Sequence, residues 1–214
     1  MIIDCISDLH GSYPDLEGGD LLLIAGDLTT NDSPMAWKNY YEWLKTLKYR
    51  KIIYIAGNHD GFLTQCVNST DAKMMGFEEE EFEYLCDSGT EFEGIKIYGS
   101  PWTPRFYDWY FMKNTKGELK ERWDLIPKDI DILITHGPPF GILDHNKALN
   151  RCGCDQLLKA IKRVKPKYNI FGHIHGGYGI LEKDGTTFIN CAHMNEEYEP
   201  INKPIRINYA PQER

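Results

Sequence analysis

The sequence has no excess of basic charge and no long apolar stretch. Its 214 residues include 24 Lys and Arg against 32 Asp and Glu, which gives a net charge of -8. A protein that binds nucleic acid regardless of sequence needs a basic face, and this charge balance argues against one. A membrane-spanning helix needs about 20 consecutive apolar residues, and no run here approaches that length. We therefore expect no membrane insertion and no stable binding to nucleic acid.

The six cysteines lack the spacing of a zinc site or a disulfide framework. Cys152 and Cys154 are one residue apart, and no second pair follows at zinc-ribbon spacing. Cys5 and Cys191 lie in apolar runs, where a thiol behaves as a small hydrophobic group. We recognise no secretory signal, and a chain of this size does not need disulfides to fold. We expect all six cysteines to be reduced and the protein to be cytoplasmic.

The sequence has no internal repeat, linker or low-complexity tract. With 42% hydrophobic and 26% charged residues it has the composition of an ordinary globular protein. These features predict a single domain over residues 1–214. The acidic run EEEEFE at 78–83 is predicted to be the solvated face of a helix.

Several apolar runs rich in β-branched residues end in polar side chains. They are MIIDCIS (1–7), DLLLIA (20–25), KIIYIA (51–56), IDILIT (130–135) and YNIF (168–171). Runs that are apolar almost throughout are typical of strands buried on both faces of a sheet.

Helical patterns lie between these runs. Apolar residues repeat at helical spacing from Trp37 to Leu47, after a cap candidate at Ser33 and a proline at Pro34. A second helix is predicted in CDQLLKAIKRVKP, which Pro166 ends. Strands that alternate with helices indicate an α/β fold, with strands largely parallel in its first half.

Two later stretches are predicted to be antiparallel hairpins. Their turn signals are Glu93-Gly94 and Asp184-Gly185.

Acidic, amide and imidazole side chains follow the predicted strands, where α/β sheets bind their ligands. They are Asp8, His10, Asp27, Asn58, His136, His173 and His175. Turn or cap chemistry explains any one of them. The same coincidence at five successive strand ends indicates a site instead.

This set of nitrogen and oxygen donors indicates the kind of metal. It contains no thiolate and four histidines, which suits Mn, Fe, Zn or Co rather than Mg or Ca. Seven ligands are too many for one tetrahedral zinc, and they suit two ions roughly 3.5–4 Å apart that share a carboxylate and a water or hydroxide. We expect two divalent ions, Mn²⁺ first, with Fe, Zn or Co as alternatives.

The same residues resemble the signature of the calcineurin-like metallophosphoesterases. In chain order the motifs are Asp8-x-His10, Gly26-Asp27, Gly57-Asn58-His59-Asp60, Thr135-His136-Gly137 and Gly172-His173-x-His175. The resemblance implies an α/β fold in which two mixed β-sheets pack face to face with helices outside them, a four-layer αββα sandwich.

A narrower likeness concerns the metallophosphoesterase-domain-containing proteins, whose best-known members are expressed in brain. The stretches GDLLLIAGDLT, IYGSPWTPRF, THGPPFGILD and FGHIHGGYGI resemble that group. The likeness implies a metal-dependent phosphodiesterase, with cyclic nucleotides among its substrates. Some members have glycine in place of a histidine in the last motif, and this chain keeps both His173 and His175.

The resemblance also implies a role for each motif residue. Asp8, His10 and His175 would hold the first metal, Asn58, His136 and His173 the second, and Asp27 would bridge them. A hydroxide shared by the two metals would attack phosphorus in line.

The two residues after Asn58 would act on the substrate. His59 would face the phosphate rather than a metal, where it could stabilise charge and protonate the leaving oxygen. Asp60 would accept a hydrogen bond from the other ring nitrogen of His59, with helix capping as its alternative role.

Substrate choice is predicted to depend on the aromatic stretch PWTPRFYDWYF at 101–111. Trp102 could stack on a nucleobase and Arg105 could meet a phosphate, beside Asn58 and His59. Core packing and a homodimer contact are the alternatives for these rings.

Rival functions remain at this point. A phosphomonoesterase or a protein phosphatase would use the same motifs, and a non-catalytic scaffold would keep the fold. Scaffolds of this kind typically lose ligands, whereas all seven are present here. We expect a small-molecule phosphodiester as the substrate.

Overall fold

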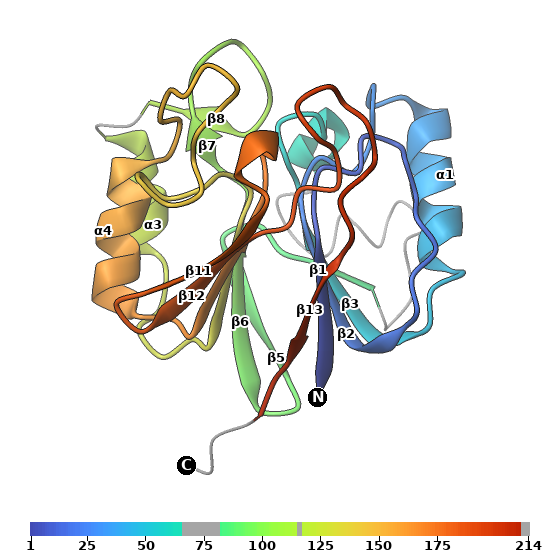
Figure 1. Ribbon diagram of the computed structural model, residues 1–214, viewed down its shortest axis with the longest axis horizontal. Coiled ribbons are helices and arrows are strands. Elements are labelled where there is room, and N and C mark those ends of the chain that lie inside the picture. Colours follow the sequence, from blue (N-terminus) through green and yellow to red (C-terminus); the bar gives the residue numbers. More distant parts are fainter. Residues whose placement is uncertain (66–81, 115–116, 211–214) are drawn as a thin grey trace.

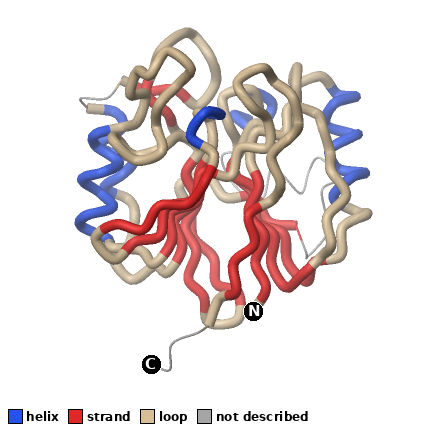
Figure 2. Tube along the Cα trace, viewed as in Figure 1, coloured by secondary structure: helices blue, strands red, loops and turns tan. Residues whose placement is uncertain are grey.

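The computed structural model describes residues 1–65, 82–114 and 117–210. Two β-sheets lie face to face, and helices cover their outer sides (Figures 1 and 2). This arrangement confirms the predicted α/β fold with its four-layer αββα order. The acidic run predicted as a helix falls outside the described residues, except that Phe82 and Glu83 lie in a strand. The prediction of a helix is wrong for those two residues.

The first sheet contains the first strands of the chain. Its order is β13-β1-β2-β3-β4, with bounds Ile205–Asn208 (β13), Ile2–Ile6 (β1), Gly19–Ala25 (β2), Tyr49–Ile55 (β3) and Phe82–Tyr84 (β4). The strands β1 to β4 are parallel, as predicted for this half of the chain. β13 runs antiparallel to β1.

The second sheet has the order β11-β12-β10-β9-β6-β5. Its strands are β5 (Ser88–Phe92), β6 (Ile95–Ser100), β9 (Ile132–Thr135), β10 (Tyr168–Phe171), β11 (Gly179–Lys183) and β12 (Thr186–Asn190). The pairs β5–β6 and β11–β12 are antiparallel hairpins, as predicted. Both residues of each turn have positive φ, and aspartate-glycine is a typical sequence for such a turn. Two short strands, β7 (Thr103–Pro104) and β8 (Met112–Lys113), pair beyond the end of this sheet.

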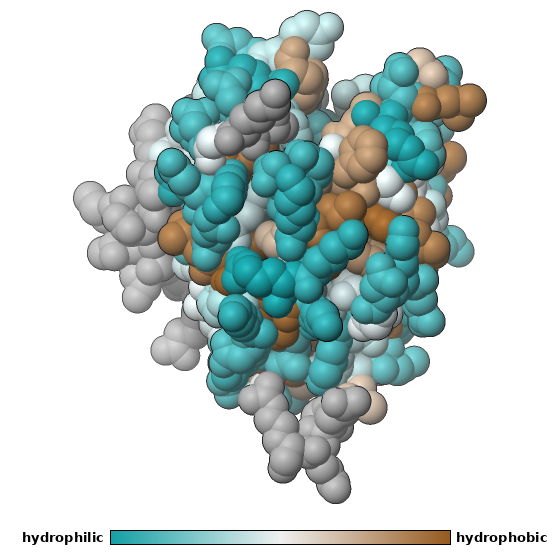
Figure 3. Space-filling model, turned by 90° about the vertical axis from the view of Figure 1, so that its left-hand side faces the viewer, coloured by the Kyte–Doolittle hydropathy of each residue, from teal (hydrophilic) through white to brown (hydrophobic). Residues whose placement is uncertain are grey.

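The helices cover the outer faces of the two sheets (Figure 1). α1 (Pro34–Leu44) lies on the first sheet, and the Ser33 side chain caps it by accepting a hydrogen bond from the Ala36 N–H at 3.2 Å. α3 (Glu118–Asp124) and α4 (Asp155–Val164) lie on the second sheet, and α3 was not predicted. The side of the molecule that carries α3 and α4 is largely hydrophilic (Figure 3).

Successive side chains of each strand point to opposite faces of the sheet, so the core forms separate apolar layers. Ile53 of β3 and Ile134 of β9 belong to the apolar layer between the sheets. Leu22 and Ile24 of β2 face the other way and pack with Tyr40 of α1. Each fully buried side chain of this size stabilises the fold by about 1.5–3 kcal/mol. The strands are buried on both faces, which explains why their sequences are apolar almost throughout.

Two further sequence predictions can be compared with the described part of the chain. Cys5, Cys86, Cys152, Cys154 and Cys191 are free thiols, and Cys66 lies outside the described residues. Within residues 1–65, 82–114 and 117–210, no helix is both long and apolar enough to cross a bilayer.

Candidate metal centre

The loops that follow β1, β2, β3, β9 and β10 meet at one edge of the two sheets, at the top of Figure 1. Four residues in these loops have a left-handed backbone: Asp8 (φ 52°), His10 (φ 42°), Asp27 (φ 53°) and His173 (φ 65°). This conformation costs a non-glycine residue roughly 1–2 kcal/mol. Backbone strain of this kind persists where the surrounding structure imposes it, and it is concentrated at functional sites.

Motif glycines make room for the carboxylates. A Cβ atom on Gly57 would lie 2.2 Å from Oδ1 of Asp27, and one on Gly172 would lie 2.0 Å from Oδ2 of Asp8. Real Cβ atoms do not come this close to another heavy atom. The two glycines are therefore required because each carboxylate packs directly against backbone.

Asp8, His10 and His175 form a first group of donors. One ligand atom from each lies within 4.8 Å of the others. Nδ1 of His175 bonds to the backbone carbonyl of Asn195 at 2.9 Å, so Nε2 is the nitrogen that faces Oδ1 of Asp8, at 3.3 Å. Nε2 of His10 is buried and has no hydrogen-bond partner in the described part of the chain. A buried ring nitrogen without a partner is costly unless it binds something, such as a metal ion.

Asp27, His136 and His173 form a second group, again with ligand atoms within 4.8 Å of one another. Nδ1 of His136 bonds to the carbonyl oxygen of Ala25 at 2.8 Å. Its Nε2 then lies 3.3 Å from Oδ2 of Asp27 and 3.1 Å from Oδ1 of Asn58. A histidine held by a backbone carbonyl through one nitrogen is typical of metal ligands, because the bond fixes which nitrogen is free.

Asp27 connects the two groups. Its Oδ2 lies 3.6 Å from Nε2 of His10 on one side and 3.3 Å from Nε2 of His136 on the other. The structure thus brings together all seven of the side chains that the sequence singled out. Their nitrogen and oxygen donors, with one orphaned imidazole nitrogen, fit divalent ions.

Burial and mutual charge shift the titration of these groups in the metal-free site. Burial raises the pKa of Asp8, but the hydrogen bond and charge of His175 outweigh it and bring the pKa down to about 2. Burial lowers the pKa of His136, but the charge of Asp27 outweighs it and raises the pKa to about 9. Burial and the charge of His136 lower the pKa of His173 to about 4. Without metal, a proton on His136 therefore balances part of the negative charge.

His59 lies at the wall of the site. Its backbone N–H donates to Oδ1 of Asp27 at 2.9 Å, and its ring is 4.7 Å from the ring of His10 and 4.5 Å from that of Trp109. His59 also forms a third group of donors with His10 and Asp27. Its imidazole is half-buried and faces a pocket.

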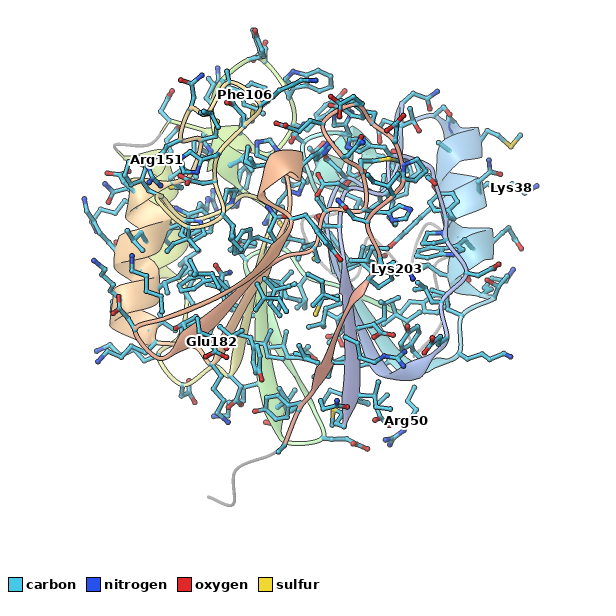
Figure 4. The ribbon with its side chains drawn as sticks, in the orientation of Figure 1. Lys38, Arg50, Phe106, Arg151, Glu182 and Lys203 are labelled. Carbon is cyan, nitrogen blue, oxygen red and sulfur yellow. The ribbon has the colours of Figure 1, made fainter. Side chains whose placement is uncertain are left out.

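That pocket has a volume of about 650 Å³, and its floor includes Asp27, His173 and His175. Its walls are lined by the aromatic residues Phe106, Tyr107, Trp109 and Tyr198. Phe106 lies at the top of the molecule, 5.6 Å from the ring of His173 (Figure 4). Arg105 also lines the pocket, and its guanidinium lies 3.6 Å from Oδ1 of Asp108. The donors therefore form the floor of a cavity large enough for a small organic molecule.

A family model described as calcineurin-like phosphoesterase matches residues 1–177. The chain belongs to the calcineurin-like phosphoesterases. Membership confirms the family resemblance that the motifs indicated. Metallophosphoesterases act through divalent metal ions, and the two donor groups are where such ions would bind.

Individual relatives of this phosphoesterase agree with that assignment. Metallophosphoesterase domain-containing protein 1 of Homo sapiens is 38% identical over 226 residues, which cover 95% of this chain and 69% of that protein. A Synechococcus protein named "Probable cyclic nucleotide phosphodiesterase" is 24% identical over 195 residues, 86% of this chain and 69% of its own. The solved structure of phosphopantetheinyl hydrolase from Mycobacterium tuberculosis shares the fold, with a TM-score of 0.60 over 98% of each chain and 15% identity.

The position of Asp60 in this phosphoesterase differs from the prediction. Its buried carboxylate accepts hydrogen bonds from the backbone N–H groups of Gly57 at 2.7 Å, Leu28 at 3.0 Å and Thr29 at 3.2 Å. No hydrogen bond joins it to the His59 ring in the described residues. The predicted ring-orienting contact is therefore wrong. Asp60 instead ties together the two loops that carry Asp27 and Asn58.

Trp102 also lies elsewhere than predicted. Its Nε1 donates to Oδ2 of Asp87 at 2.8 Å, and the guanidinium of Arg122 lies over its ring at 5.1 Å. It is half-buried against the core layers and is not among the residues that line the pocket. The predicted stacking role of Trp102 is therefore wrong, because core packing takes up its ring.

Tyr198 was missed from the sequence. Its ring lies 5.1 Å from that of His10 and 5.0 Å from that of His175, at the rim of the first donor group. The segment around it carries no motif and lies more than 20 residues beyond the last one. Only the fold brings it to the site.

Proposed function

We propose that this chain is a metal-dependent phosphodiesterase that hydrolyses small phosphodiesters, with cyclic nucleotides among the candidates. The observation that carries the proposal is the shared carboxylate of Asp27 between two donor groups on the floor of an aromatic-walled pocket. Of the described residues lining that pocket, only Arg105 carries a fixed positive charge. A phosphodiester carries one negative charge and a monoester about two, so sparse basic charge favours the diester. The name of the Synechococcus relative points the same way.

The proposal assigns each donor to one of two ions. Asp8, His10 and His175 would hold the first, Asn58, His136 and His173 the second, and Asp27 would bind both. When bound, such ions stabilise negative charge on phosphoryl oxygens and lower the pKa of water. Mn²⁺ is our first choice, with Fe, Zn or Co as alternatives for the same nitrogen-rich set.

His59 is proposed to supply the proton for the leaving group. In the reaction, water loses a proton to solvent as its oxygen forms a bond to phosphorus, the ester P–O bond breaks, and the departing oxygen takes a proton from His59, which solvent then restores. The ring contact with Trp109 holds the imidazole against the pocket wall. Asn58 and Arg105 would contact the phosphate from other sides of the pocket.

The alternative is that His59 binds a metal ion itself, because it forms a donor group with His10 and Asp27. We favour the substrate role because the ring nitrogens of His136 and His175 are fixed by backbone carbonyls. No such bond to His59 is found in the described part of the chain. The variant His59→Ala separates the roles: we expect both metals to remain and turnover to fall about 10²–10⁴-fold. Loss of one metal per chain would make His59 a ligand.

The test of the function is hydrolysis by the Mn-loaded protein with and without a chelator. The panel contains a simple aryl diester, its monoester, and 3′,5′- and 2′,3′-cyclic nucleotides. Chelator-sensitive cleavage of diesters well above the monoester would support the proposal. Preferential cleavage of the monoester would make the protein a phosphomonoesterase. No turnover of any ester by protein with two bound metals would favour a scaffold.

We place this activity in the cytoplasm. The five described cysteines are free, which suits a reducing compartment. A labelled full-length chain found in an oxidising compartment would contradict this placement.

A further inference from the structure

A second, smaller pocket lies beside the first at the same edge of the sheets. Its volume is about 310 Å³, and it shares residues 146, 173–175 and 198 with the larger pocket. The rest of its lining is Lys147, Ala148 and Glu196. The two cavities therefore meet over the donor groups, and Tyr198 stands at their boundary.

Tyr198 is held at this boundary by the backbone. Its φ of 58° is left-handed, which is unusual for a bulky aromatic residue. Its N–H donates to the carbonyl oxygen of Asn195 at 3.0 Å. The same carbonyl bonds to Nδ1 of His175 at 2.9 Å. One oxygen thus fixes both the imidazole of a proposed ligand and the backbone of Tyr198, which lines both pockets.

Glu196 gives the second pocket its chemical character. Its side chain is half-buried, and its carboxylate packs over Gly176, where a Cβ atom would lie 2.9 Å from Cδ of Glu196. Lys147 lines the same pocket but forms its ion pair with Glu197. Within the described residues, no hydrogen bond or ion pair joins the Glu196 carboxylate to another side chain. The pocket therefore offers an acceptor that is free to bind a donor from a ligand.

A phosphodiester has two ester substituents, and the structure has two pockets that meet at the donors. We propose that the second pocket binds one substituent of a linear phosphodiester, a small group with a hydroxyl or ammonium donor that binds Glu196. The other substituent, planar or apolar, lies in the larger pocket against Phe106 and Trp109. This inference rests on the proposed function and narrows its substrate class. A cyclic nucleotide joins both ester oxygens to one sugar and so does not fill both pockets.

The test compares three diesters of 4-nitrophenol that differ in a small second alcohol. The second group is 2-aminoethyl, 2-hydroxyethyl or ethyl, and kcat/KM is measured on the Mn-loaded protein. A hydrogen bond to a charged group corresponds to a difference of about 10- to 100-fold in kcat/KM. We expect at least one donor-bearing ester to exceed the ethyl ester by that factor, and the order of the two identifies ammonium or hydroxyl as the natural donor. Equal values for all three esters would overturn the inference.

Two variants place the effect in the second pocket. Glu196→Gln should reduce the preference for the aminoethyl ester over the ethyl ester, because it removes the charge and keeps the shape. Ala148→Phe should lower kcat/KM for the linear diesters relative to a 3′,5′-cyclic nucleotide, because Ala148 lines only the smaller pocket. Glu182→Gln is the matched control, since Glu182 lies on β11, away from Phe106 and the site (Figure 4). If Glu196→Gln leaves the preference unchanged, Glu196 is not the acceptor and the inference is wrong.

Binding separates this inference from the proposed function. The dissociation constants of three non-hydrolysable phosphonate analogues with the same second groups are measured by calorimetry. Tighter binding of a donor-bearing analogue, lost in Glu196→Gln, supports the second pocket even if no diester is turned over. Turnover of all three esters with equal affinities would leave the phosphodiesterase proposal intact and refute the second pocket.

Discussion

Replacing Gly57 by alanine tests whether the packing at Asp27 is as tight as the structure indicates. The new Cβ would lie 2.2 Å from Oδ1 of Asp27, 2.3 Å from its backbone nitrogen and 2.7 Å from Cε1 of His136. A flexible side chain could move aside, but the backbone nitrogen cannot do so without moving the whole loop. Overpacking of this kind costs about 1–3 kcal/mol. Displacement of the loop would also weaken the 2.7 Å hydrogen bond from Gly57 N–H to Asp60, worth about 1 kcal/mol.

We therefore expect Gly57→Ala to lower the free energy of unfolding by about 2–4 kcal/mol. For a chain of this length, that corresponds to a fall in Tm of roughly 5–15 °C. The Asp27 carboxylate would move with the loop, so metal content should also fall below that of the wild type. Urea unfolding and elemental analysis of the purified protein measure the two effects.

Gly94 provides the control for a glycine with free space around it. Unlike Gly57, it has a positive φ, 80°, and a Cβ there would meet nothing within 4 Å. Gly94→Ala should cost only the roughly 1–2 kcal/mol of a left-handed alanine and leave metal content unchanged. A Gly57→Ala protein that unfolds like the Gly94→Ala protein and keeps both metals would refute the packing argument.

Three further perturbations test other parts of the site. Asp27→Asn should lose at least one metal per chain and nearly all turnover, because it weakens the one carboxylate between both donor groups; full metal content by elemental analysis would contradict that role. Asp60→Asn should lower the free energy of unfolding by about 1–3 kcal/mol, because the amide nitrogen replaces one of the two oxygens that accept buried backbone N–H groups; a variant with lower turnover but wild-type urea unfolding would show that this structural role is wrong. In the metal-free protein, the pKa of His136 is raised to about 9, above its usual value near 6.5. Its contribution to stability is therefore complete below pH 6.5 and is lost as the pH rises through 9. Thermal unfolding in EDTA should show a falling Tm between pH 6.5 and 9.5. Over the same range the gain in Tm on adding Mn²⁺ should grow, because only neutral imidazole binds metal. A metal-free Tm that does not change over this range would count against the raised pKa of His136.

The strands and hairpins could be predicted because their signals are local. The apolar run KIIYIA and the pair Asp184-Gly185 carry the information for a buried strand and a tight turn within a few residues. The meeting of Asp8, Asp27 and His136 followed from one rule, that the carboxyl ends of strands in an α/β sheet share an edge. Those parts of the site required no knowledge of side-chain direction.

The sequence-based predictions failed where the direction of a side chain or a contact between distant residues determines which residues line the site. Asp60 follows His59 in sequence, but its carboxylate turns towards the loop after β2, and nothing in the sequence reveals that. Trp102 and Trp109 look alike in an aromatic stretch, and only the fold shows that one packs near Asp87 and the other beside His59. Tyr198 depends on a loop closed by Asn195, far from every motif.

The strand β13 has a consequence for how the protein is made. It pairs with β1, so residues near position 205 complete the sheet that begins at Ile2. During synthesis, the outer edge of β1 has no partner until residues 205–208 have emerged from the ribosome. An open edge of an apolar strand is a template for aggregation, and contacts between distant residues form slowly. His175 likewise joins Asp8 from far along the chain, so the nascent chain acquires its first donor group only after residue 175 has emerged.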